Sequence, residues 1–262
     1  MKILLYAFCF FFSFAFGQLN PQNGTVDSKA NYYALKNATI VVSPTKTIQN
    51  GTLLIKNDEI VDAGMLVIIP EGAIEIDCSG KIILPGFIEL NSSIGLPNPV
   101  QPSFSFRPQL ESAKAGAYYW NDAVHPEVQA DALFSIDSKA NNELKKYGFC
   151  SAITHINDGV FQGTGSLVGL GNESVHQQIL SAKAAQFISF NKGVSHQTYP
   201  SSQMGSIALI RQVYYDALWY ETSEKTPINL SLEAIISSKE TPSIFYTDDK
   251  WEILRAAKIG NE

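Results

Sequence analysis

The sequence predicts a two-part α/β protein, in which a small all-β unit is followed by strands and helices in alternation. Between residues 38 and 83, short β-branched runs are separated by turn signals such as Asn50-Gly51. After Pro85-Gly86, helix-like and strand-like segments alternate, which is typical of parallel βα units. The stretch from Phe87 to Glu262 is shorter than the ~250 residues of a closed eight-stranded (β/α) barrel. The second part is therefore predicted to be an incomplete barrel.

The composition is that of an ordinary folded protein. Of the 262 residues, 45% are hydrophobic and 17% are charged, and the formal net charge is -6. Because the positive charges do not cluster, a nucleic-acid partner bound through its phosphates is not expected. The three cysteines form no Cys-x-x-Cys pair, which argues against a cysteine-ligated zinc ribbon.

The first segment, MKILLYAFCFFFSFAFGQ, has the pattern of a signal peptide. An apolar run follows Lys2 and ends in small residues, so we expect residues 1–17 to be removed by cleavage between Gly17 and Gln18. The run is shorter than the ~20 residues of a membrane-spanning helix, so no membrane anchor is expected after cleavage. The mature protein is predicted to be exported, to a periplasm or to the outside. Cys78 and Cys150 would remain, and two separate buried thiols are a simpler interpretation than a disulfide.

The predicted domains follow from this organisation. Residues 18–84 form the β unit, with strands expected in ATIVVSP, NGTLLIKNDEIVDAG and AIEIDCSGKIILPG. Residues 85–262 form the βα unit, which begins with the apolar strand FIEL. Helices are expected at Asn121 to Phe134, Ser138 to Tyr147, Gln203 to Glu221 and Asp248 to Ile259, and further strands at Ser151 to Ile156, Gln186 to Phe190 and Ser243 to Tyr246.

Two further patterns leave alternatives open. GTGSLVGLG (163–171) lacks the Lys-Ser/Thr of a phosphate-binding loop, so its apolar centre favours a short β-hairpin or a buried loop. An aromatic cluster could form core or line a groove for a ligand or a sugar, and helical spacing favours core. The cluster comprises Tyr118, Tyr119, Trp120, Tyr214, Tyr215, Trp219 and Tyr220.

The string KIILPGFIELNSSIG (81–95), preceded by the NGTLLIKNDEIVDAG hairpin, resembles the start of the amidohydrolase family of imidazolonepropionase-like and dihydroorotase-like metal-dependent hydrolases. The matching residues are Gly80, Lys81, Pro85, Gly86, Phe87 and Ile88. Weaker similarity continues in YGFCSAITHINDG, GTGSLVGLG and DDKWEILRAAKIGNE. The resemblance implies a small β-sandwich followed by an incomplete TIM-like (β/α) barrel.

The metal motif of that family is replaced in this chain. In the family the first barrel strand ends in His-x-His, and the corresponding positions are Asn91 and Ser93, with Glu89 as the preceding acid. Two imidazoles two positions apart lie on one face of a strand and can bind one metal ion. An amide and a hydroxyl are neutral and weaker ligands. We therefore expect no metal cofactor for this chain, whereas the resemblance implies a divalent metal, zinc, in active relatives.

The remaining candidates for chemistry are few. His155 ends a predicted strand, where barrel chemistry is located, and Asp158 could orient it; a hydrogen-bonded histidine at the barrel mouth is the simpler alternative. His125 has no partner at a ligating spacing, and His176 and His196 lie in polar loops. No Gly-x-Ser-x-Gly nucleophile elbow is present.

Three functional hypotheses follow. By resemblance, the chain is part of an exported hydrolase that acts on non-peptide C–N bonds of a small amide or cyclic amide, with a metal-bound water as nucleophile. Alternatively, it is a catalytically inactive relative or fragment that serves in binding or assembly. The third is a plain binding module for peptides or glycans. An unclosed sheet also leaves an edge, which favours oligomers or a longer chain.

Overall fold

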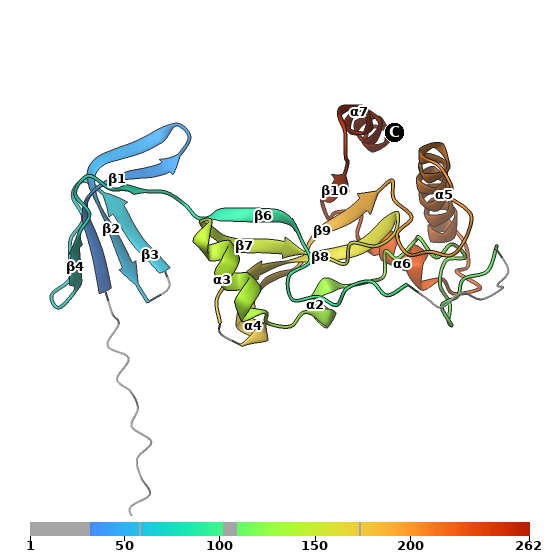
Figure 1. Ribbon diagram of the computed structural model, residues 1–262, viewed down its shortest axis with the longest axis horizontal. Helices are drawn as coiled ribbons and strands as arrows, with labels where there is room; N and C mark the ends of the chain where they lie inside the picture. The colour runs from blue at the N-terminus through green and yellow to red at the C-terminus, as the bar shows by residue number, and fades with distance from the viewer. Residues whose placement is uncertain (1–31, 58, 102–108, 173) are drawn as a thin grey trace, which may run out of the picture. The chain divides into compact units, whose positions relative to one another are not determined.

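The computed structural model describes residues 32–57, 59–101, 109–172 and 174–262. The predicted signal peptide and the cleavage pair Gly17 and Gln18 lie outside these residues. The chain divides into two compact units between Pro85 and Gly86. Each unit contains one sheet of five strands. Figure 1 labels most of these strands. No described helix is long and apolar enough to cross a bilayer.

The first unit is all-β, as the sequence predicts. Its strands form one sheet in the order β3-β2-β1-β4, and β5 also pairs with β1. Antiparallel pairing joins β1 to β2 and β2 to β3, whereas β4 and β5 run parallel to β1. Ala38, Ile40, Leu53 and Cys78 form its buried core. The strands are β1 (Tyr32–Ser43), β2 (Lys46–Lys56), β3 (Glu59–Gly64), β4 (Ile74–Asp77) and β5 (Ile82–Ile83).

The sheet of the second unit is mixed rather than wholly parallel, in the order β10-β9-β8-β7-β6. Parallel pairing joins β6 to β7 and β9 to β10, while β8 is antiparallel to both of its neighbours. Four strands therefore run in one direction, with one reversed strand among them, and the sheet curls into a half-barrel. The strands are β6 (Phe87–Ser92), β7 (Phe149–Thr154), β8 (Phe161–Gly169), β9 (Ile179–Ser189) and β10 (Ser243–Tyr246).

Strand β8 corrects the prediction of a short hairpin or loop at GTGSLVGLG. It is a nine-residue central strand, and most of its residues are buried. Its glycines lower strand propensity, but they allow close packing. A Cβ atom on Gly165 would lie 2.4 Å from the Phe187 ring, and one on Gly163 would lie 2.2 Å from the Val128 carbonyl oxygen. Gly163 and Gly165 therefore weaken the strand signal in the sequence, but the close approach of Val128 and Phe187 requires glycine at both positions.

Most of the predicted helices of the second unit form with shifted ends. The prediction of a helix over Asn121 to Phe134 is wrong for most of its length, since only α2 (Ala130–Leu133) forms there. Pro126 lacks an amide hydrogen and disfavours helix at His125, and Val124 instead makes an isolated bridge to Phe161. The helices are α2 (Ala130–Leu133), α3 (Ser138–Lys146), α4 (Val175–Gln178), α5 (Gln203–Thr222), α6 (Leu230–Ser237) and α7 (Lys250–Gly260).

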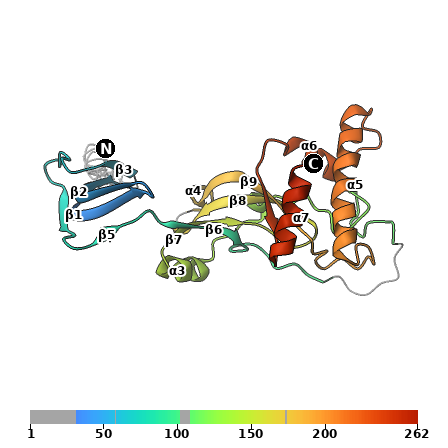
Figure 2. The same cartoon turned by 90° about the horizontal axis from the view of Figure 1, so that it is seen from above.

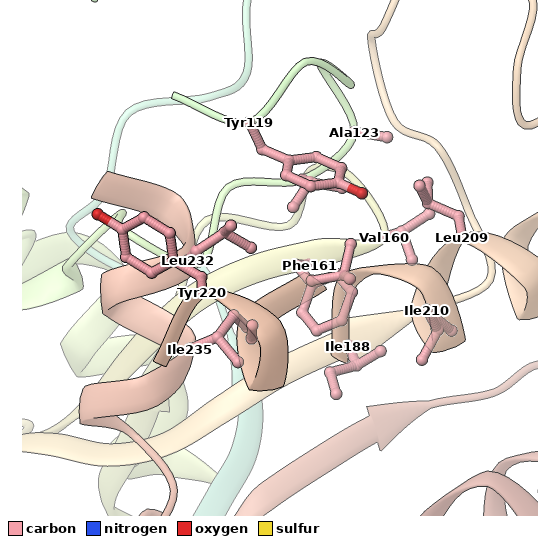
Figure 3. Packing of buried hydrophobic residues seen from close by; sticks show 13 residues of the cluster. Tyr119, Ala123, Val160, Phe161, Ile188, Leu209, Ile210, Tyr220, Leu232 and Ile235 are labelled. Carbon is pink, nitrogen blue, oxygen red and sulfur yellow. The ribbon is translucent and has the colours of Figure 1, made fainter. Parts of the chain in front are cut away.

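The largest core of this unit lies between the sheet and helices α5 and α6. Figure 3 shows Phe161 of β8 and Ile188 of β9 facing Ile210 of α5 and Ile235 of α6. The aromatic cluster is split: Tyr119 and Tyr220 are buried in this core, but Tyr214, Tyr215 and Trp219 are exposed. The prediction of core packing therefore holds for only part of the cluster.

The two cysteines of the described residues are both free. Cys78 is buried, in agreement with the prediction of a buried thiol. Cys150 is exposed, which corrects the same prediction for that residue. It is the second residue of β7, beside the edge strand β6, and its thiol contacts the Phe87 carbonyl oxygen at 3.5 Å.

Candidate functional site

The ends of β6 and β7 bring three of the predicted site residues to one edge of the half-barrel. These strands are parallel, so their carboxyl ends meet at the same edge. Asn91 belongs to β6, Ser93 follows it directly, and His155 follows β7. The His155 backbone N–H donates to the Ser92 carbonyl oxygen at 2.9 Å. Carboxyl ends of barrel strands are the usual place for chemistry in such folds.

A hydrogen bond joins the side chains of Asn91 and His155. The distance from His155 Nε2 to Asn91 Oδ1 is 2.8 Å. With the amide oxygen as acceptor, Nε2 carries the proton and Nδ1 keeps its lone pair. Asn91 is exposed, whereas His155 is only 1% exposed. The pair therefore connects a solvent-facing amide to a buried imidazole.

The surroundings of His155 keep its ring neutral. The ring stacks on Phe187, with centroids 3.6 Å apart and planes at 10°. Burial lowers the pKa of His155 to about 4, and the Ile156 backbone offsets this only in part. Nδ1 is buried without a hydrogen-bond partner of good geometry among the described residues. At neutral pH the imidazole is therefore an uncharged group, and a weak base.

Asp158 faces a different histidine from the one that the sequence suggested. Its Oδ2 lies 3.7 Å from His125 Nε2, and its Oδ1 accepts the Val194 backbone N–H at 2.8 Å. Burial lowers the pKa of His125, while the charge of Asp158 acts in the opposite direction. Asp158 thus joins the loop before β8 to the loop after β9 through its hydrogen bond with Val194. The polar partner observed on His155 is Asn91.

The other candidates lie apart from this pair. Ser93 is exposed, and it lines a shallow polar hollow with Asn98 and Asp137. The Glu89 carboxylate accepts the Asn91 backbone N–H at 3.0 Å, which fixes the acid against its own strand. His176 lies exposed on the short helix α4, not in a loop as predicted, and His196 is exposed in a loop.

The described residues do not fit the zinc site that the family resemblance implies for active relatives. Among them, no group of three or more His, Cys, Asp or Glu residues lies close enough to hold a metal ion. The amide oxygen of Asn91 is already used by His155, and Ser93 supplies only a neutral hydroxyl. At these two positions the chain therefore offers an amide oxygen that is already hydrogen-bonded and a hydroxyl, in place of two imidazoles.

Sequence reasoning missed Phe187 and Gly165, which shape the setting of His155. Phe187 appeared only as part of a predicted strand, because nothing local distinguishes a stacking ring from other core residues. Gly165 carries a usable signal, since a glycine inside a strand often marks close approach of a neighbour. A Cβ atom there would collide with the ring on which His155 stacks.

Similarity to known proteins is confined to the fold. No protein-family model and no curated protein matches the chain. Among solved structures, the chain is similar to an amidohydrolase from Thermotoga maritima MSB8, with a TM-score of 0.65 and 23% identity. The match covers 87% of this chain and 61% of that one, so the chain spans less than two thirds of that protein.

Two other structures resemble the chain too weakly to support an argument. A prolidase complexed with N-methylphosphonate-L-proline has a TM-score of 0.25 at 16% identity, over 47% of this chain and 25% of that one. An uncharacterized protein has a TM-score of 0.23 at 20% identity, over 26% and 17% of the two chains. The likeness to the amidohydrolase therefore supports the predicted resemblance at the level of fold.

Proposed function

We propose that the chain is the amino-terminal part of an exported amidohydrolase-like protein, and that its half-barrel serves in binding or assembly rather than as a hydrolytic metal centre. In this proposal the first unit corresponds to the small β-sandwich of such proteins. The second corresponds to an incomplete TIM-like barrel. The fold likeness supports this arrangement, and the signal-peptide pattern supports export.

The observation that carries the proposal is the closed Asn91–His155 pair. In the resembling family, the position of Asn91 holds a metal-binding imidazole. Here the amide oxygen instead accepts from His155 Nε2 at 2.8 Å. The histidine is buried and neutral, and it is stacked on Phe187. These residues can orient one another and present neutral polar atoms to a small amide-type molecule, but they supply no charged metal ligand.

Metal analysis of the full secreted protein tests this proposal. After a chelator wash and dialysis against zinc, we expect well below one zinc per chain in the wild type. The double variant Asn91→His with Ser93→His should raise the zinc content, because it restores the two imidazoles of the His-x-His motif at the end of β6. The matched control is Asn91→His with Ser92→His, which adds two imidazoles without the His-x-His spacing and should not. Stoichiometric zinc bound to the wild type through these strand ends would contradict the proposal.

A second candidate function is hydrolysis of non-peptide C–N bonds by the whole protein. It is favoured by the likeness to an amidohydrolase, of which this chain spans only 61%. A panel of small amides and cyclic amides tests it. If the full protein hydrolyses any of them and the rate survives His155→Phe, the catalytic residues lie outside the pair. If the rate is lost with that variant, the pair itself takes part, and the binding role is wrong.

A further inference from the structure

We draw no further inference here: the strongest candidate, the polar hollow between the starts of α5 and α7 (Figure 2) at the carboxyl ends of β9 and β10, rests on two helix N-termini, its partly buried charged side chains Lys192 and Glu252 already pair with the Gln197 carbonyl oxygen and the Gln203 amide, and nothing among the described residues shows what it would bind.

Discussion

Strands β6 and β8 belong to the same sheet, yet their burial is the reverse of what their compositions suggest. β6 begins with the apolar run FIEL, and Phe87, Ile88 and Leu90 are all at least half exposed. β8 has the sequence FQGTGSLVG, with three glycines and several polar residues, but it is almost entirely buried. In the strand order, β6 is at one end and β8 is in the middle.

The difference shows that position in the strand order, rather than hydrophobicity, decides burial in this unit. A central strand is covered by its neighbours on both sides, so its polar groups must find partners inside. Thr164 accepts from Gln186 at 2.8 Å, and Ser166 donates to the Ala182 carbonyl oxygen at 2.7 Å. Strand β6 lies at the edge, but its apolar run is typical of a strand that is buried on both faces of a sheet.

The largest expected effect comes from the same substitution made on both strands. Phe161 of β8 is 1% exposed and lies in the main core, whereas Phe87 of β6 is 58% exposed. Phe161→Ala should lower the free energy of unfolding by about 4 kcal/mol, through lost burial and the cavity that remains. Phe87→Ala should lower it by about 1 kcal/mol, because it loses mainly the ring contact with Phe149. Urea unfolding followed by circular dichroism measures both.

This pair of variants can also break the comparison. Phe87→Ala could lower the free energy of unfolding of the full protein as much as Phe161→Ala does. In that case Phe87 is buried in the full protein, and β6 is not an exposed edge strand. An equal slope of free energy against urea for the two variants serves as the control, since it shows that both unfold from equally compact states.

The same contrast explains which parts of the fold could be predicted. Strand β10 was predicted with its exact bounds, because SIFY is β-branched and aromatic and lies between turn residues. β8 was missed because Gly163 and Gly165 weaken the local signal, and their reason, contact with Val128 and Phe187, lies far away in the sequence. Most of the helix predicted over Asn121 to Phe134 does not form, because Pro126 lacks an amide hydrogen and disfavours helix before it.

The candidate site divides in the same way. Spacing and the family resemblance identified Asn91, Ser93 and His155, since strand ends can be located from sequence. The bond between Asn91 and His155 could not be predicted, because it depends on the register of two strands more than 60 residues apart. The stacking of His155 on Phe187 likewise needs the reversed strand β8, which the assumption of purely parallel units excluded.

Lowering the pH is a further test of the contrast between exposed and buried strands, because burial beside the central strands disfavours protonation of the His155 imidazole. The pKa of His155 is about 4 in the folded chain and about 6.5 when unfolded. Between these values the unfolded chain binds a proton that the folded chain does not. The free energy of unfolding should therefore fall by up to about 3 kcal/mol as the pH drops from 6.5 to 4, with no further loss from this group below 4.

Urea unfolding at a series of pH values measures this loss, with His155→Phe as the control. Phenylalanine keeps a ring against Phe187 and does not titrate, so most of the loss should disappear. A smaller loss of stability at low pH should remain in the variant, because burial also lowers the pKa of His125. If the variant keeps the whole pH dependence, His155 is not protected from protons in the folded chain.

The smallest expected effect concerns the side-chain hydrogen bond between Asn91 of the exposed strand β6 and the buried His155. Asn91→Ala removes the acceptor of His155 Nε2, but the exposed position of Asn91 lets water replace it in part. The free energy of unfolding should therefore fall by only about 1 kcal/mol. Ser93→Ala, also exposed and two positions along, should change it by less than about 0.5 kcal/mol. Equal effects of the two variants at neutral pH would mean that the hydrogen bond between Asn91 and His155 contributes nothing to the free energy of unfolding.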